Sequence, residues 1–255
     1  MMRLLGKLRK ILVPLFRKFG MFRPSPATKS YKASQIPNIE FLFDFVFQET
    51  IGTLIEIGAY NGLDFSNSLP LIRKSWTAHL IEPNPRLFRE CVLNLMDFGN
   101  VSVHEFAISD KAGVSTIFDL GPISTLENSM REEFKNFSWA TPHFTQEVYS
   151  VKTVTLMDFL QNMAVEKDFE LLIVDVEGHE SQVFSTLFLS DFRPKMIIVE
   201  LSDFHPSLHS KKQSHWKLSQ QILNLGYDII FKDSINTIFV KRSILREVLL
   251  NVDHV

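Results

Sequence analysis

The chain has 255 residues, of which 45% are hydrophobic and 22% are charged, and this fits one soluble α/β domain with a tail. Its single cysteine, Cys91, excludes an intramolecular disulfide and any cysteine-based zinc site. The net charge of −2 is unevenly divided: residues 1–40 hold nine basic side chains against one acid, so they carry +8 and the remainder carries −10. Such an acidic body disfavours duplex nucleic acid, and we expect no nucleic-acid partner.

The segment 1–37 is predicted to be a basic amphipathic helix followed by a linker. Leucine and isoleucine recur at helical spacing among basic residues over 1–22, and prolines mark 23–37. No apolar run approaches the ~18 residues that a membrane-spanning helix needs. Two alternatives stay open: residues 1–23 lie on an anionic lipid surface, or they pack on their own domain. We therefore expect a cytoplasmic protein, with or without peripheral contact at the inner face of the membrane.

The remaining residues, 38–255, alternate between predicted strands and helices, beginning with a capped helix over 38–48. The predicted strands are rich in Ile, Leu and Val and cover 53–57, 77–82, 101–107, 171–175, 196–201, 227–232 and 236–241. The predicted helices cover 63–73, 85–97, 156–163, 178–188 and 214–225. Most of the strands lack polar alternation, which is typical of a parallel sheet with helices on both faces.

Two segments depart from this alternation. The strands 227–232 and 236–241 are separated by too few residues for a parallel crossover, so they are predicted to form an antiparallel hairpin. Residues 113–155 form an insertion with predicted short strands at 113–118 and 151–156 and a polar, irregular stretch between them. We interpret the insertion as a lid over a substrate, with a surface elaboration as the alternative.

Two acids and two glycines mark a nucleotide-binding βαβ unit. Glu56 lies at the end of one strand and is followed by Gly58 and Gly62, and Glu82 ends the next strand about twenty residues later. An acid in the position of Glu82 accepts hydrogen bonds from ribose hydroxyls. Tyr60 occupies the place where a dinucleotide fold has its second glycine. The pattern thus favours a nucleoside ligand without phosphates, and an NAD-dependent oxidoreductase is the weaker alternative.

Further acids are predicted at the carboxyl edge of the sheet. Asp175 and Glu177 follow one strand, His179 opens the next helix, and Glu200 ends another strand. Asp175 and His179 are the candidate catalytic residues, as bases. Asp175, Glu177 and Glu200 are candidate ligands for a divalent metal of the Mg²⁺ or Ca²⁺ type, although a metal is not favoured.

Five motifs in this order resemble those of the FkbM-family methyltransferases. They are Leu54-Ile-Glu-Ile-Gly-Ala-Tyr-Asn-Gly, Ile81-Glu-Pro-Asn-Pro, Ala107-Ile-Ser-Asp, Val174-Asp-Val-Glu-Gly-His-Glu and Ile198-Val-Glu-Leu. The family typically has Asp where this chain has Glu56, which keeps the carboxylate.

The resemblance implies the class I Rossmann-like methyltransferase fold and S-adenosylmethionine as cofactor. The residues expected to bind the cofactor are Glu56, Gly58, Gly62, Glu82, Asn84, Ala107, Asp110 and Asp175. For Asn84 a helix cap, and for Asp110 an Asx turn, are the alternatives. The implied reaction is O-methylation of a small-molecule or glycan acceptor: a sugar, a glycolipid or a secondary metabolite. A non-catalytic, membrane-associated protein on the same fold is the remaining alternative.

Overall fold

The protein is described here by a computed structural model that covers residues 34–48 and 50–252. The predicted helix over 1–22 and most of the predicted linker lie outside the described residues. The described end of that linker packs into the domain, because Ile36 is completely buried and contacts the hydrophobic core. Within the described part of the chain, no helix is long and apolar enough to cross a membrane.

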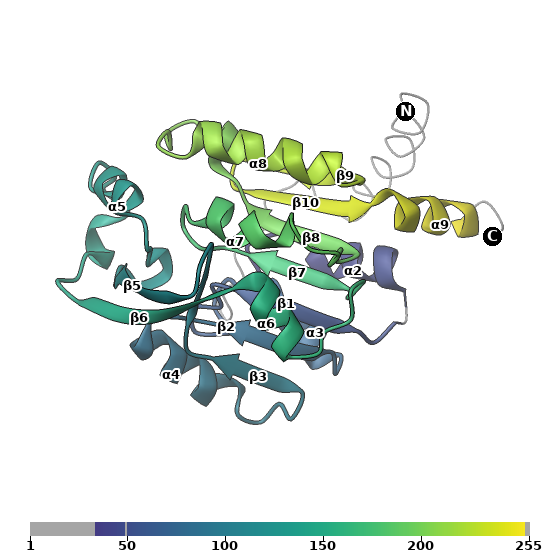
Figure 1. The fold of residues 1–255 in the computed structure, drawn as a ribbon, viewed down its shortest axis with the longest axis horizontal. Helices are drawn as coiled ribbons and strands as arrows, with labels where there is room; N and C mark the ends of the chain where they lie inside the picture. Colours follow the sequence, from purple (N-terminus) through teal and green to yellow (C-terminus); the bar gives the residue numbers. More distant parts are fainter. Residues whose placement is uncertain (1–33, 49, 253–255) are drawn as a thin grey trace.

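A seven-stranded sheet forms the centre of the molecule, and its order is β3-β2-β1-β7-β8-β10-β9 (Figure 1). The strands are β1 (Thr53–Ile57), β2 (Thr77–Ile81), β3 (Val101–His104), β7 (Leu171–Val174), β8 (Met196–Glu200), β9 (Tyr227–Lys232) and β10 (Asn236–Lys241). Neighbouring strands are parallel except β10, which is antiparallel to both β8 and β9. The predicted parallel sheet with a C-terminal antiparallel hairpin is confirmed.

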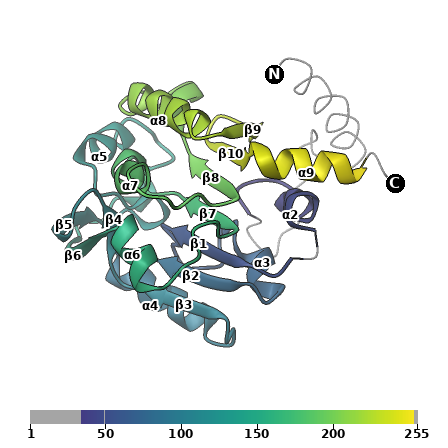
Figure 2. The same ribbon diagram turned by 45° about the vertical axis from the view of Figure 1, so that its right-hand side comes forward.

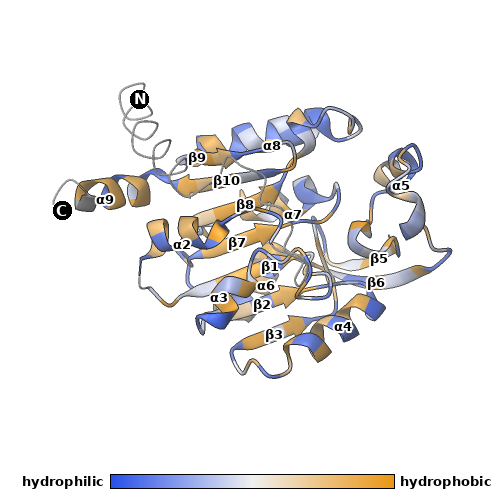
Figure 3. Ribbon diagram, turned by 180° about the vertical axis from the view of Figure 1, so that it is seen from behind, coloured by the Kyte–Doolittle hydropathy of each residue, from blue (hydrophilic) through white to orange (hydrophobic). Residues whose placement is uncertain are grey.

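Helices cover both faces of this sheet, as predicted. One face packs against α2 (Ile39–Phe47), α3 (Leu69–Arg73), α4 (Pro85–Leu95) and α9 (Arg242–Val252). The other packs against α6 (Leu156–Asn162), α7 (Glu180–Leu187) and α8 (Lys212–Asn224). Alternate residues of a strand enter opposite cores, so Leu54 belongs to the first and Ile55 to the second. Figure 3 shows the resulting apolar strands, and Figure 2 shows α9 beside α2.

A second, three-stranded sheet lies beside the first, and the insertion supplies two of its strands. It consists of β4 (Ala107–Ser109), β5 (Gly113–Phe118) and β6 (Val148–Thr155), with β6 in the middle. The predicted strand over 101–107 is therefore wrong: it divides into β3 and β4, which belong to different sheets. The segment between β5 and β6 holds η1 (Gly121–Ile123), α5 (Asn128–Phe134) and η2 (Thr141–His143) around a small core of its own. Because α5 has only two turns, periodicity did not reveal it.

Two predicted helices begin later than expected. Residues 63–68 form a loop, since the side chain of Asn61 accepts hydrogen bonds from the amides of Leu63 and Asp64 and Phe65 is left-handed (φ 61°). Helix α3 starts only at Leu69. Likewise α7 starts at Glu180, because Glu177 (φ 53°) and Gly178 (φ 99°) have left-handed backbones. Both loops lie at the carboxyl edge of the sheet.

Candidate functional site

A cavity of about 310 Å³ lies at the carboxyl edge of the parallel strands. Its walls come from the loops that follow β1, β2 and β7, from residues 64–67 and from the segment 117–143 of the insertion. Open parallel sheets bind their ligands at this edge, and small-molecule cavities begin at about 300 Å³. Of the predicted site residues, those that line the cavity are Glu56, Gly58, Glu82, Ala107, Asp175, Glu177 and His179.

The glycine loop after β1 is shaped by close contacts that exclude a side chain. A Cβ atom at Gly58 (φ 90°) would lie 1.7 Å from the carbonyl oxygen of Asp175. At Gly62 (φ 75°) it would lie 2.7 Å from Cδ1 of Leu95 on α4. Gly58 therefore lets the loop pass against the tip of β7, while Gly62 lets it pack on α4 outside the cavity wall.

Glu82 is buried and ties this loop to the end of β2. Its Oε2 accepts a hydrogen bond from the amide of Tyr60, and its Oε1 accepts one from the amide of Asn84, both at 2.9 Å. Burial raises the pKa of Glu82 to about 8, although the two backbone amides lower it. Each carboxylate oxygen keeps a lone pair for a further donor, so the group is able to receive two hydroxyls from the cavity.

Asn84 and Asp110 lie outside the cavity wall. The side chain of Asn84 is fully buried and caps α4 by accepting hydrogen bonds from the amides of Arg86 (3.0 Å) and Leu87 (3.5 Å). Asp110 is exposed beyond the end of β4 and accepts a hydrogen bond from the hydroxyl of Ser109. Asn84 therefore has the helix cap that was its alternative interpretation, whereas the contact of Asp110 is with a neighbouring side chain.

Glu56 is buried beneath the glycine loop. Its Oε2 accepts a hydrogen bond of 2.5 Å from the hydroxyl of Ser68, which precedes α3. Burial, and to a smaller degree the negative charge of Asp175, raise the pKa of Glu56 to about 7, against the lowering effect of the Ser68 hydrogen bond. A group that titrates this close to neutrality responds to any cation placed in the cavity.

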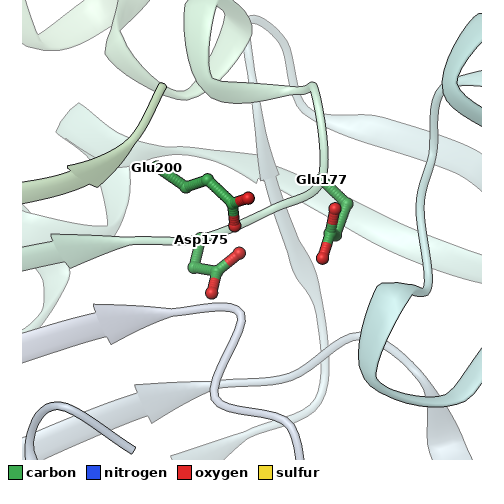
Figure 4. Close-up of side chains that lie close together, drawn as sticks. All are labelled: Asp175, Glu177 and Glu200. Atoms are coloured by element: carbon green, nitrogen blue, oxygen red, sulfur yellow. The ribbon is translucent and has the colours of Figure 1, made fainter. Parts of the chain in front are cut away.

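Three acids meet where β7 and β8 end (Figure 4). Asp175, Glu177 and Glu200 offer carboxylate oxygens that all lie within 4.8 Å of one another. Burial first, and mutual repulsion second, raise the pKa values of Glu177 and Glu200 well above the ordinary range. The pKa of Asp175 is also raised by burial, and Glu200 hydrogen-bonds to it. The cluster can therefore hold a shared proton or, with its oxygen ligands, a hard divalent cation.

His179 is the centre of a hydrogen-bonded network that joins the two sheets. Its Nε2 lies 2.9 Å from the hydroxyl of Ser109, and its Nδ1 lies 2.7 Å from Oε1 of Glu127. The other oxygen of Glu127 pairs with Lys211 at 2.7 Å. The hydrogen bond from His179, followed by that from Lys211, lowers the pKa of Glu127 to about 2. Both ring nitrogens of His179 are thus occupied by protein groups.

Glu180 holds the loop that carries Glu177. Its Oε1 accepts hydrogen bonds from the amides of Gly178 (3.0 Å) and Val176 (3.4 Å), and its Oε2 lies 2.8 Å from Nε2 of His215. Both side chains of the Glu180–His215 pair are buried. Neither residue was among the predicted site residues. Together they fix the backbone beside the acid cluster.

Several residues in or next to the cavity were missed from the sequence. Gln35 donates a hydrogen bond of 2.7 Å from its Nε2 to Asp175, although it falls in the predicted linker. Trp139 and His143 line the cavity from the insertion. Glu127 contacts a predicted site residue across 52 positions of sequence. Glu127, Trp139 and His143 lie in the segment 113–155, which was interpreted as a lid, but that interpretation named no single residue.

Comparison with solved structures finds methyltransferases of low identity. One is an O-methyltransferase from Bacillus cereus in complex with SAH (TM-score 0.47, 13% identity, 92% of this chain and 91% of that chain). Another is a putative O-methyltransferase from Klebsiella pneumoniae (TM-score 0.42, 10% identity, 92% and 90%). A third is a precorrin-6y C5,15-methyltransferase from Geobacter metallireducens (TM-score 0.42, 10% identity, 84% and 92%). Likeness at this level carries no argument about the acceptor.

Among curated proteins, none matches this chain significantly. The family described as "Methyltransferase FkbM domain" matches residues 56–229, which is more than half of the chain and contains every predicted catalytic and cofactor-binding residue. The family match confirms the methyltransferase class and S-adenosylmethionine as cofactor, both of which the motifs implied. The alternative of an NAD-dependent oxidoreductase is therefore wrong. The chain belongs to the FkbM methyltransferase family.

Proposed function

We propose that this protein transfers the methyl group of S-adenosylmethionine to a hydroxyl of a small or glycan acceptor: a sugar, a glycolipid or a secondary metabolite. The single observation that carries the proposal is the position of Glu82, a buried carboxylate on the cavity wall that accepts hydrogen bonds from Tyr60 in the glycine loop and from Asn84 after β2. The acid cluster of Asp175, Glu177 and Glu200 also supports the proposal, because two of its carboxylates line the same cavity and could accept a proton from a hydroxyl.

The residues of the cavity fit the parts of the cofactor. Glu82 would accept hydrogen bonds from the two ribose hydroxyls, and Ala107 at the start of β4 would contact the adenine. Gly58 lines the cavity beside Asp175, where the methionyl part would lie, and Glu56 and Asp175 would offer carboxylates to its ammonium group. Tyr60, with a left-handed backbone (φ 52°), stands where a diphosphate would need a glycine. When bound, the cofactor supplies a methyl group already activated by a cationic sulfur.

The protein must also remove the proton of the acceptor hydroxyl. Asp175 is proposed as the base, because its raised pKa brings it nearer to neutrality, where a general base is most effective. Gln35 donates to Oδ2 of Asp175 and Glu200 hydrogen-bonds to the same carboxyl group, so the acceptor hydroxyl would use a lone pair that these two contacts leave. His179 is the second candidate, and it would accept a proton on Nε2 only after the hydroxyl of Ser109 moves away. Both groups line the cavity.

A metal is not part of the proposed reaction. The oxygen ligands of Asp175, Glu177 and Glu200 suit Mg²⁺ or Ca²⁺. However, Asp175 already accepts a hydrogen bond from Gln35 and shares one with Glu200, so two of its contacts are satisfied within the protein. The cationic sulfur of the cofactor already activates the methyl group, so no Lewis acid is needed. Proton removal by these acids is sufficient for the proposed transfer.

Calorimetric titration tests the cofactor assignment. The wild-type chain is expected to bind S-adenosylhomocysteine and to give no heat with NADH. Glu82→Ala should weaken binding by about tenfold or more, because hydrogen bonds to a charged group are lost. Transfer of a labelled methyl group into a cell extract, followed by identification of the product, tests the acceptor class. Unchanged affinity in Glu82→Ala would refute the assignment, and label on nitrogen or carbon alone would refute O-methylation.

The membrane contact of residues 1–23 stays a prediction, as does the cytoplasmic location, because the segment lies outside the described residues. We propose that this segment, with seven basic side chains and no acid, binds anionic lipid. Flotation with phosphatidylserine vesicles compares the full chain with a variant that lacks residues 1–23. Equal flotation of the two proteins would contradict the proposal.

A further inference from the structure

An aromatic side chain stands half-exposed on the cavity wall. Trp139 lies between α5 and η2, lines the cavity and is 52% exposed. Single exposed apolar side chains are common and need no functional explanation. Trp139 differs from the other exposed tryptophan of the described residues, Trp216 on α8 (53% exposed), because Trp216 does not line the cavity.

The indole of Trp139 is held in place by two phenylalanines. The ring of Phe137 stacks on it at a centroid distance of 5.6 Å and an angle of 26°. The ring of Phe134 meets it edge-on at 5.9 Å and 67°. Phe134 is itself buried in the small core of the insertion, next to Met130. A ring fixed in this way loses little conformational entropy when a ligand covers it.

A polar group stands at the same cavity. His143 ends η2 and lines the cavity, and among the described residues its ring nitrogens make no hydrogen bond. The ring packs near Gly121, where a Cβ atom would lie 3.5 Å from its Nδ1. A neutral imidazole offers one donor and one acceptor. The wall thus combines an apolar ring with a free hydrogen-bonding group.

We propose that Trp139 and His143 form the acceptor subsite, in which the indole stacks on the C–H face of a pyranose ring and the imidazole hydrogen-bonds one of its hydroxyls. A pyranose has an apolar face and a polar edge, which match these two side chains. A hydroxylated aromatic ring could also contact both side chains, so it is the competing ligand in the test. The proposal rests on the proposed function and names the substrate class of the same site.

Saturation-transfer NMR on the full chain loaded with S-adenosylhomocysteine tests this subsite. The probes are the methyl pyranosides of glucose, galactose, mannose and rhamnose, with catechol as the aromatic comparison. At least one pyranoside is expected to receive saturation through its C–H protons. Trp139→Ala should weaken its binding by about tenfold or more, since stacking on an aromatic ring is lost. His143→Ala should weaken it as well, and Trp216→Ala is the matched control that should not.

The outcomes separate this subsite from the cofactor site. Affinity for S-adenosylhomocysteine should be the same in wild type, Trp139→Ala and Trp216→Ala. If S-adenosylhomocysteine does not bind the wild type, the proposed function fails and the subsite fails with it. If S-adenosylhomocysteine binds, two results would refute the subsite alone. One is that no pyranoside receives saturation, whether or not catechol does. The other is that Trp139→Ala binds the pyranoside as well as Trp216→Ala does.

Discussion

The protonation of Glu82 should couple cofactor binding to pH. Burial raises the pKa of this carboxyl group to about 8, from its ordinary value of 4.5. In the unliganded protein it therefore holds a proton below that pH. In the proposed complex it accepts hydrogen bonds from ribose hydroxyls and from the amides of Tyr60 and Asn84, which requires the ionised form. Binding must release the proton, so affinity should rise with pH and level off above the pKa.

The size of the effect follows from the same value. If only the carboxylate binds, affinity falls about tenfold for each pH unit below the pKa. Because half of the group is ionised at pH 8, the loss between pH 8 and pH 6 amounts to about 50-fold, or about 2.3 kcal/mol. At pH 6 Glu82 should release close to one proton per ligand, and Glu56, with a pKa of about 7, should add to this release if it pairs with the ammonium group.

Calorimetry with S-adenosylhomocysteine at several pH values, in two buffers of different ionisation heat, measures both the affinity and the protons released. The Gln side chain of Glu82→Gln cannot titrate. The slope of log affinity against pH should therefore be smaller by about one in this variant than in the wild type. Its absolute affinity should also be lower, because its amide donor faces a backbone amide. Glu90→Gln is the control, since Glu90 is an exposed partner of Arg86 on the same helix and does not line the cavity. A wild-type affinity that is equal at pH 6 and pH 8, or an unchanged slope in Glu82→Gln, would refute the reasoning.

Three further predictions concern the loop, the network and the acids. Gly58→Ala should abolish S-adenosylhomocysteine binding and lower the melting temperature, because its Cβ would lie 1.7 Å from a carbonyl oxygen, whereas Gly99→Ala, with nothing within 4 Å, should do neither. The lowered pKa of Glu127 stabilises the fold above pH 4.5, and this stabilisation is lost as the pH falls toward about 2. At neutral pH Glu127→Gln should therefore cost about 2–3 kcal/mol and lower the melting temperature by ~4–10 °C. Glu132→Gln, which removes an exposed ion pair on the same helix, should leave it unchanged, and equal melting of the two variants would contradict the role of the network. Methyl transfer should survive dialysis against EDTA, and a loss that Mg²⁺ restores would show that Asp175, Glu177 and Glu200 hold a metal.

The central sheet and the cofactor end of the site could be predicted because their signals are local. Runs of branched apolar residues mark strands buried on both faces, and the short connection before β10 permits only a hairpin. Glu82 and the glycine pair lie within one βαβ unit, so their spacing alone placed them together. Asp175, Glu177 and Glu200 were correctly expected to meet, since parallel strands end at a common edge.

The rest of the site was decided by contacts between distant segments. Gln35 and Asp175 are 140 positions apart, and Glu127 and His179 are 52 apart, so no spacing rule joins them. Two other differences are local: hydrogen bonds to Asn61 delay the start of α3, and Asn84 caps α4, which was its alternative role.

The sequence by itself therefore determined the sheet and the family, and it marked Gly58 and Glu82, which line the cavity. Only the tertiary structure decided what covers that cavity, because the insertion packs around its own small core and presents Trp139 and His143 by that packing. Periodicity and spacing indicate whether a segment is a helix or a strand and which of its faces is buried. They do not record where a folded insertion comes to rest against another sheet.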